Sequence, residues 1–137
     1  MHLHPTVLLK AGQLKLKTLT YLFLKLILAC ALDPVGISNS SAIPDQRFTA
    51  SSLRGGGNPS NGRLKGGSAW IPGSNNNSND YLEIDLGSVY FVCGVATQGN
   101  PNADDWTKTY KIETSLDNVN WTMYVEDNVE KVHVHLC

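Results

Sequence analysis

A strict alternation of apolar and polar residues in the segment "YLEIDLG", residues 81–87, most constrains how this chain can fold. The apolar positions are Leu82, Ile84 and Leu86, and the acidic ones are Glu83 and Asp85. Successive side chains of a β-strand point to opposite faces, so this period of two predicts a strand with one buried face. The two acids lie two residues apart, which also raises the question of a catalytic carboxylate pair.

The body of the chain reads as all-β, because no window of helical period follows residue 33. Short β-prone runs alternate with gaps rich in Gly, Asn, Ser and Pro, which predict projecting loops. The segment "DNVN", residues 117–120, predicts a hairpin turn from which "WTMYVE" pairs back. Besides residues 81–87, the expected strands are 47–52, 89–99, 106–116 and 121–126.

The length of the chain limits the number of domains, and its charge limits the kinds of ligand that it can bind. A chain of 137 residues predicts a single domain. Of its 11 basic residues, four lysines lie among the first 29 residues, which leaves seven against twelve acids in the rest of the chain. Nucleic-acid binding depends on clustered Lys and Arg, so this balance excludes nucleic acid as a partner.

The N-terminal segment, residues 1–29, has the outline of a signal peptide. Spaced lysines precede an apolar run, and the small residues Ala29 and Ala31 stand in the spacing of a cleavage site. We therefore expect a secreted, extracellular protein with its domain at 30–137. The alternative is that the head is unrelated sequence fused to the start of a domain, because Lys25 interrupts the apolar run. Acylation of Cys30 as a lipid anchor is a minor third reading.

The cysteines and the glycosylation signals matter if the protein is secreted into an oxidising compartment. The disulfide candidates Cys30, Cys93 and Cys137 are odd in number, so at least one lacks an intrachain partner in an oxidising compartment. If the chain is secreted, the glycosylation candidates are Asn39, Asn76 and Asn120.

The order of several separated motifs resembles a discoidin domain, the coagulation factor V/VIII type C module. These motifs are "IPDQRFTASS", "NGRL", "AW", "YLEIDLGSVYFVCGVATQG", "YKIETSLDNVNWTMY" and "EKV". The resemblance runs from about Cys30 to Val132. It implies a β-sandwich of the galactose-binding-like kind, a distorted jelly-roll barrel that binds ligands through loops at one end. It also implies that Leu82, Ile84 and Leu86 are core, with Asp85 pairing with an arginine such as Arg63.

By position, the resemblance places three binding loops at residues 53–61, 73–80 and 99–105. Trp106, at the edge of the third loop, is the aromatic residue we expect at the ligand, whereas Trp70 and Trp121 are expected to fill the core. The candidate ligand-binding residues are Leu53, Arg54, Asn58, Asn61, Asn75, Asn76, Asn77, Asn100, Asn102, Asp104, Asp105 and Trp106.

The polar loops favour a glycan or protein ligand on a cell surface or in the extracellular matrix, and hence a role in adhesion. In membrane-binding relatives, such loops resemble spikes with large apolar tips above basic residues. Here only Leu53 and Arg54 fit that description, and Asp104 and Asp105 would repel an anionic surface. A peripheral module for anionic phospholipids is therefore the alternative.

Catalysis, cofactors and metals are not expected. Nothing near Glu83 and Asp85 supplies a nucleophile or the apolar surroundings of a general acid. His133, His135 and Cys137 alternate and would share one face of a strand, but no fourth ligand is marked by spacing, so no metal site is predicted.

The chain departs from the family pattern at its C-terminus. The resemblance would continue beyond "EKV" through further strands to a closing cysteine, and Cys137 comes too early for that role. We therefore expect a truncated domain with open sheet edges and a partly uncovered core. A non-functional fragment from a faulty gene model stays an alternative to both binding functions.

Overall fold

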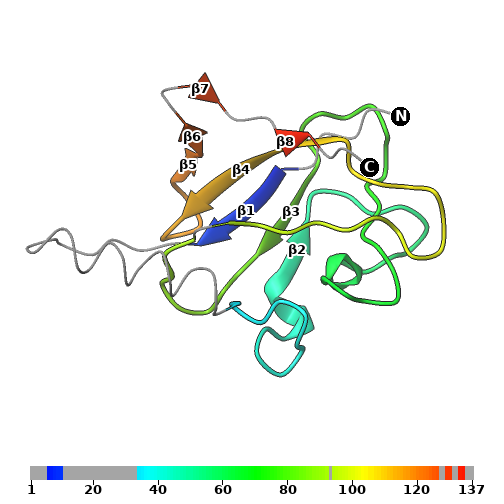
Figure 1. The fold of residues 1–137 in the computed structure, drawn as a ribbon, viewed down its shortest axis with the longest axis horizontal. Coiled ribbons are helices and arrows are strands. Elements are labelled where there is room, and N and C mark those ends of the chain that lie inside the picture. Colours follow the sequence, from blue (N-terminus) through cyan, green and yellow to red (C-terminus); the bar gives the residue numbers. More distant parts are fainter. Residues whose placement is uncertain (1–5, 11–33, 93, 127–128, 131–132, 135–137) are drawn as a thin grey trace, which may run out of the picture.

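The fold is taken from a computed structural model, which describes residues 6–10, 34–92, 94–126, 129–130 and 133–134. The described chain consists of short strands and two single-turn 3-10 helices, which agrees with the all-β prediction (Figure 1). The elements are β1 (Thr6–Lys10), η1 (Asp45–Arg47), β2 (Phe48–Ala50), η2 (Pro59–Gly62), β3 (Tyr81–Ile84), β4 (Thr109–Ser115), β5 (Trp121–Met123), β6 (Val125–Glu126), β7 (Val129–Glu130) and β8 (His133–Val134).

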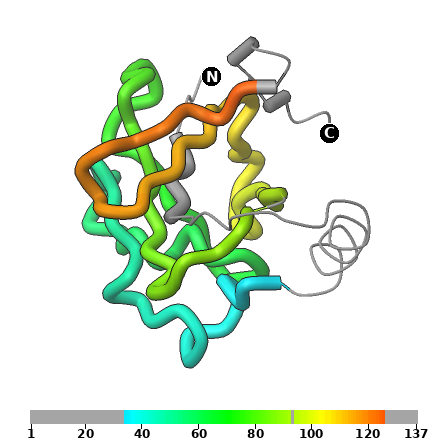
Figure 2. Tube along the Cα trace, turned by 90° about the vertical axis from the view of Figure 1, so that its left-hand side faces the viewer, coloured from blue at the N-terminus to red at the C-terminus, as the bar shows by residue number. Residues whose placement is uncertain are grey.

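One main sheet organises the molecule, with strand order β2-β3-β1-β4-β5 and β8 pairing with β4. The pairs β2–β3 and β4–β5 are antiparallel, whereas β1 runs parallel to both β3 and β4. In the side view of Figure 2, the cyan to teal chain around β2 lies toward the bottom and the orange β5 region toward the top. The strands β6 and β7 form a separate two-stranded ladder.

The position of β1 differs from the expectation that residues 1–29 lie outside the domain. Thr6–Lys10 pairs with four residues of β3 and five of β4 and so lies in the middle of the sheet. Its sequence, Thr-Val-Leu-Leu-Lys, is rich in strand-favouring residues. That expectation assigned residues 1–29 together on the basis of their composition. The local sequence does not indicate that a strand pairs with partners about 75 to 105 residues away. Residues 11–33 lie outside the described part of the chain, and the signal peptide stays a prediction.

The core lies where the alternating pattern predicts it. Leu82, Ile84 and Leu86 are buried and pack with Ile43 and Phe48. Tyr110 and Ile112 of β4 are also buried, and burial raises the pKa of the Tyr110 hydroxyl. The prediction of an inward apolar face for residues 81–87 is therefore confirmed.

The core is incompletely filled. A mainly apolar cavity of about 310 Å³ borders Leu82, Ile84, Trp70 and Tyr110. Residues 94–99 run along it without a strand assignment, although a strand was expected over 89–99. In the described part of this segment only Tyr90 makes a β-bridge. A β-prone run becomes a strand only where a neighbouring backbone pairs with it along its length, so the prediction of a continuous strand was wrong for the described residues of this segment.

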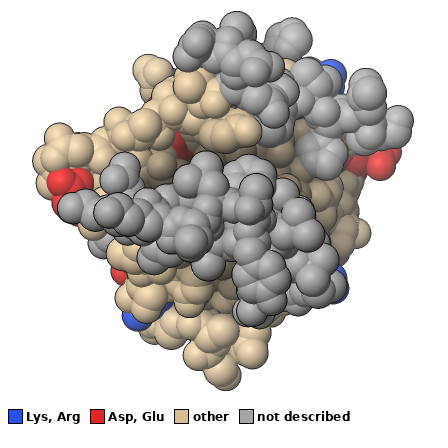
Figure 3. All heavy atoms as spheres, turned by 60° about the vertical axis from the view of Figure 1, so that its left-hand side comes forward, with Lys and Arg blue, Asp and Glu red and all other residues tan. Residues whose placement is uncertain are grey.

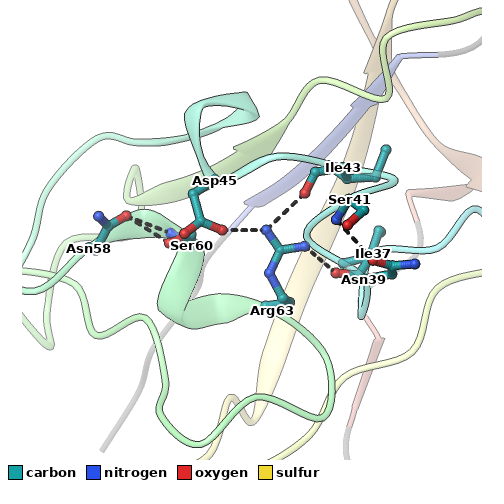
Figure 4. A network of polar contacts seen from close by, with 8 residues as sticks. All are labelled: Ile37, Asn39, Ser41, Ile43, Asp45, Asn58, Ser60 and Arg63. Atoms are coloured by element: carbon teal, nitrogen blue, oxygen red, sulfur yellow. Dashed lines mark hydrogen bonds and ion pairs between the residues drawn. The ribbon is translucent and has the colours of Figure 1, made fainter.

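The Arg63 side chain ties the segment before β2 to the end of η2 (Figure 4). Its guanidinium donates to the carbonyl oxygens of Ile37 at 2.7 Å and Ile43 at 2.8 Å, and pairs with Asp45 at 2.5 Å. The guanidinium carbon also lies 4.6 Å from the centre of the Phe48 ring. The Arg63 side chain is only 11% exposed, so these partners replace nearly all of its hydration.

Asp85 pairs with an arginine, as expected, but the partner is Arg47 and not the suggested Arg63. The Asp85 carboxylate lies 3.8 Å from the Arg47 guanidinium, and its other oxygen accepts the amide of Gly87 at 2.8 Å. Arg47 ends η1, and its carbonyl accepts the amide of Asp85, which brings the two residues together. The backbone hydrogen bond between Asp85 and Arg47, just beyond the end of β3, thus decides which arginine the Asp85 carboxylate meets.

We expect Arg63→Ala to lower the free energy of unfolding by about 3 kcal/mol, because it strands two carbonyl oxygens beside the core. Arg63→Lys should recover only part of this loss, since an ammonium group cannot reach three partners with the guanidinium's planar geometry. Urea unfolding followed by circular dichroism measures both. Lys108→Ala, at an exposed position, is the control. Equal midpoints for Arg63→Ala and Lys108→Ala would contradict the assigned role of Arg63.

The β4–β5 turn is organised by Asp117. Its carboxylate accepts the backbone amides of Asn120 at 2.8 Å and Val119 at 2.9 Å, the Asn120 side chain at 2.7 Å and the Ser115 hydroxyl at 3.0 Å. These hydrogen bonds, with that from the Asn120 backbone the largest cause, lower the pKa of Asp117 well below its ordinary value. The predicted hairpin turn at 117–120 is confirmed.

This lowered pKa predicts a dependence of stability on pH. An unfolded aspartate has a pKa of about 4, so the folded state gains stability from the ionised group above that pH and loses it as the pH falls further. We expect the melting temperature of the wild type to drop more steeply below about pH 4 than that of Asp117→Asn. Thermal melts from neutral to acid pH test this, and parallel profiles would refute it.

Candidate functional site at the loop end

The three predicted binding loops lie at the same end of the sheet, on the right of Figure 1. They are loop 1 (residues 53–61), loop 2 (73–80) and loop 3 (99–105). The turn that follows β3 and the β4–β5 turn lie at the opposite end in the same view. Loop 1 follows β2 and loop 2 leads directly into β3, so the sheet positions these loops.

Asp80 joins loops 1 and 2 from below. It is 2% exposed, and its Oδ1 accepts the hydroxyls of Ser51 at 2.9 Å and Ser52 at 2.7 Å and the side-chain amide of Asn77 at 3.1 Å. Its Oδ2 is buried and has no hydrogen-bond partner among the residues that the structure describes. Two donors from the segment between β2 and loop 1 and one from loop 2 thus converge on one carboxylate oxygen, which fixes where the chain leaves β2 and where loop 2 enters β3.

Further bonds hold these two loops side by side. The Ser52 hydroxyl accepts the amide of Gly73 at 2.9 Å, and the Ser52 carbonyl accepts the indole N–H of Trp70 at 3.0 Å. At the outer edge, the Arg54 guanidinium donates to the side-chain oxygen of Asn75, and the Arg54 amide to the carbonyl of Ile71 at 3.0 Å. The half-buried Trp70 packs on the core, as predicted.

Loop 3 is closed on itself and tied to residues 64–68. The Asn100 amide donates to the Asp105 carbonyl at 2.8 Å, which closes the loop. The Asn102 side chain donates to the Gly67 carbonyl at 2.9 Å, and the Gln98 side chain accepts the Lys65 amide at 2.6 Å. These bonds hold loop 3 against the chain that follows η2.

A small hollow lies within loop 3. Its volume is about 220 Å³, and its wall includes Asn100, Asp104, Asp105 and Trp106. The Trp106 side chain is 40% exposed, in contrast to the half-buried Trp70. An accessible indole beside carboxylates and an amide combines an apolar surface with hydrogen-bond acceptors and donors.

The structure brings some of the predicted residues together and leaves others apart. Arg54 meets Asn75, and four residues of loop 3 and its edge share the hollow. Asn58 accepts the amide of Ser60 at 3.0 Å and so caps η2, which is a structural role. Asn61 borders the apolar cavity, Asn76 is exposed in loop 2, and Asn77 is committed to Asp80.

The apolar and charged features of the loop tips are modest. Leu53 is 39% exposed next to the exposed Arg54, and Asp104 is exposed at loop 3. Figure 3 brings forward the side of the molecule away from these loops, and there the described Lys, Arg, Asp and Glu side chains are scattered rather than clustered.

Sequence reasoning missed Asp80, Ser51, Ser52 and Gln98. Asp80 was read only as the end of loop 2, and no spacing rule marks it as the acceptor of two hydroxyls from about thirty residues earlier. A buried acid at the start of a strand gives no local pattern. Glu83 and Asp85 are half-buried next to the core strand, and Asp85 is engaged by Arg47 and Gly87.

The remaining site candidates are placed as follows. Asn39 and Asn120 are exposed, as is Asn76. Cys30, Cys93, His135 and Cys137 lie outside the described residues. Within the described part of the chain, no group of three or more His, Cys, Asp or Glu could hold a metal ion. The same described residues include no helix with the length and apolarity to cross a membrane.

The described sheet thus carries three loops at one end, of which loops 1 and 2 are joined to each other and loop 3 is tied to residues 64–68. The family model of the F5/8 type C domain matches residues 47–136, and the chain belongs to this family. The family is the discoidin β-sandwich, so the prediction of both family and fold class is confirmed.

Two mammalian relatives and one insect relative are similar in sequence. The chain is 36% identical over 122 residues to lactadherin of Rattus norvegicus and 35% over 122 residues to lactadherin of Mus musculus, in each case over 77% of this chain. It is 35% identical over 72 residues, or 53% of its length, to neurexin-4 of Drosophila melanogaster. It spans 28%, 26% and 6% of these proteins respectively. No solved structure matches the chain.

We expect Asp80→Ala to loosen loops 1 and 2 together, because three donors lose their acceptor, and to cost about 2 to 3 kcal/mol of stability. Asp80→Asn keeps an acceptor oxygen and should cost less. Limited proteolysis with identification of cut sites measures loop opening, and chemical unfolding measures stability. Asp104→Ala, an exposed acid of loop 3, is the control. Unchanged cleavage of loops 1 and 2 in Asp80→Ala would show that other contacts hold them.

Proposed function

We propose that this chain is an extracellular binding module that recognises a glycan or a protein ligand through its loop end, as part of cell or matrix adhesion. The hollow of loop 3 carries the proposal, because it presents an accessible indole beside two acids and an amide. The C–H face of a sugar packs on an indole, and its hydroxyl groups donate to carboxylates and exchange hydrogen bonds with amides. The volume of the hollow, about 220 Å³, suits one small ring or side chain rather than a large ligand.

The bonds within the loop end support this function. Loop 3 is fixed through Asn102 and Gln98, and loops 1 and 2 through Asp80 and Ser52. A site whose polar groups are already oriented loses less conformational entropy on binding, which matters for weak polar ligands such as glycans. The proposal assigns no catalytic step, because the members of the discoidin family bind rather than catalyse.

A second candidate function is binding to anionic phospholipid surfaces. The observation in its favour is Leu53, which is 39% exposed beside the exposed Arg54 at loop 1. An apolar tip next to a cation can enter the interfacial region of a bilayer. Against it stand the exposed Asp104 and the engagement of Arg54 by Asn75.

The test is a glycan array probed with the full chain, followed by titration of any glycan that binds. We expect Trp106→Ala to weaken binding about tenfold, which corresponds to about 1.4 kcal/mol for a lost aromatic contact. Val119→Ala is the matched control, because this exposed apolar residue lies in the β4–β5 turn at the other end. Binding that survives Trp106→Ala unchanged would move the ligand away from loop 3.

Co-sedimentation with vesicles of phosphatidylserine in phosphatidylcholine separates the two candidates. If the chain binds glycans, it should stay in the supernatant, and Leu53→Ala should have no effect on glycan binding. Sedimentation that falls as salt rises and is abolished by Leu53→Ala, together with an empty glycan array, would replace the proposed function with lipid binding.

A further inference from the structure

The main sheet consists of two antiparallel halves that are joined by one strand. One half is β2–β3 and the other is β4–β5. Between them lies β1, with Thr6–Leu9 in register with Tyr81–Ile84, and Thr6–Lys10 in register with Lys111–Ser115. Among the described strands, no ladder joins β3 to β4 directly. The continuity of the sheet therefore depends on a segment from the far N-terminal part of the chain.

The backbone of β1 is paired on both sides. In a parallel strand with two neighbours, successive amide and carbonyl groups point alternately toward one neighbour and the other. Without β1, the facing edges of β3 and β4 would lose these partners. Both strands carry buried core residues, namely Leu82, Ile84 and Ile112. Unpaired backbone groups next to a core are costly, so the gap between β3 and β4 has a strong requirement for a strand.

The occupant of this gap and the rest of the domain are distant in sequence. Residue 10 ends β1, and the body of the described chain begins at residue 34. The sequence between them contains the small residues Ala29 and Ala31 with the spacing of a cleavage site. One cut there would break the covalent link between β1 and the body, while the two ladders of β1 with β3 and β4 would still hold it.

We propose that the gap between β3 and β4 is a strand-binding site whose occupant is the segment Thr6–Lys10, held without the covalent link and exchangeable with the same segment of a second chain. The site recognises an extended segment that enters parallel to both neighbours, by backbone hydrogen bonds on both edges. Because it lies in the middle of the sheet, the site is distinct from the loop end and independent of the proposed function.

The first experiment cuts the link in the folded full chain. A recognition sequence for a specific protease is inserted between Lys17 and Thr18, and the purified protein is cleaved. We expect the N-terminal fragment to co-elute with the body in size-exclusion chromatography and the complex to melt in one cooperative transition. Separation of the fragment from the body would overturn the proposal.

The second experiment measures exchange. A fluorescent peptide of residues 1–13 is added in excess to the cleaved complex, and its binding is followed by anisotropy. We expect the peptide to displace the resident fragment. A Leu8→Pro peptide should compete at least about tenfold more weakly, because proline removes an amide from one ladder. A Gln13→Pro peptide, changed outside Thr6–Lys10, should compete like the wild type.

These peptides leave the protein itself unchanged, so failure of a variant to fold cannot obscure the result. Equal competition by the Leu8→Pro and Gln13→Pro peptides would show that the fragment adheres without strand pairing and would overturn the proposal. If the cleaved complex does not bind the wild-type peptide, the proposed exchange of the strand is wrong.

Discussion

The Arg63 guanidinium is the interaction on which both the core and the loop end depend. It holds the carbonyls of Ile37 and Ile43 and the carboxylate of Asp45, and it lies over the Phe48 ring. Ile43 and Phe48 are core residues, so these bonds keep the chain before β2 in place against β3. Because Arg63 directly follows η2, which ends loop 1, the same group fixes one end of this loop.

Local patterns in the sequence predicted the elements that have local causes. The alternation over residues 81–87 identified the buried face of β3, and Asp117 with its neighbours identified the β4–β5 turn. The family resemblance placed the loops. Pairings between distant segments were missed, as with β1 between β3 and β4 and Asp85 with Arg47 instead of Arg63. Such pairings depend on which backbone lies alongside, and neither composition nor period carries that information.

The candidate site shows the same division. Exposed residues such as Trp106 and Asp104 could be predicted from loop positions, because a loop tip projects whatever the rest of the chain does. The groups that orient the loops are buried or come from outside them, as Asp80 and Gln98 do. Their acceptors and donors are chosen by the fold. The proposed recognition of a ligand by directed hydrogen bonds rests on a loop end whose polar groups are oriented in this way.

The sheet and the core make unequal contributions to this molecule. The cavity of about 310 Å³ means that apolar packing behind β3 is incomplete, and Phe91 and Val89 are 65% and 62% exposed. An unfilled apolar space forfeits dispersion contacts along its wall. Backbone pairing through β1 and the hydrogen bonds of Arg63 and Asp80 stabilise the same region of the molecule. Because loop 1 follows β2 and loop 2 leads into β3, the strand that joins β3 to β4 also helps to position the loop end.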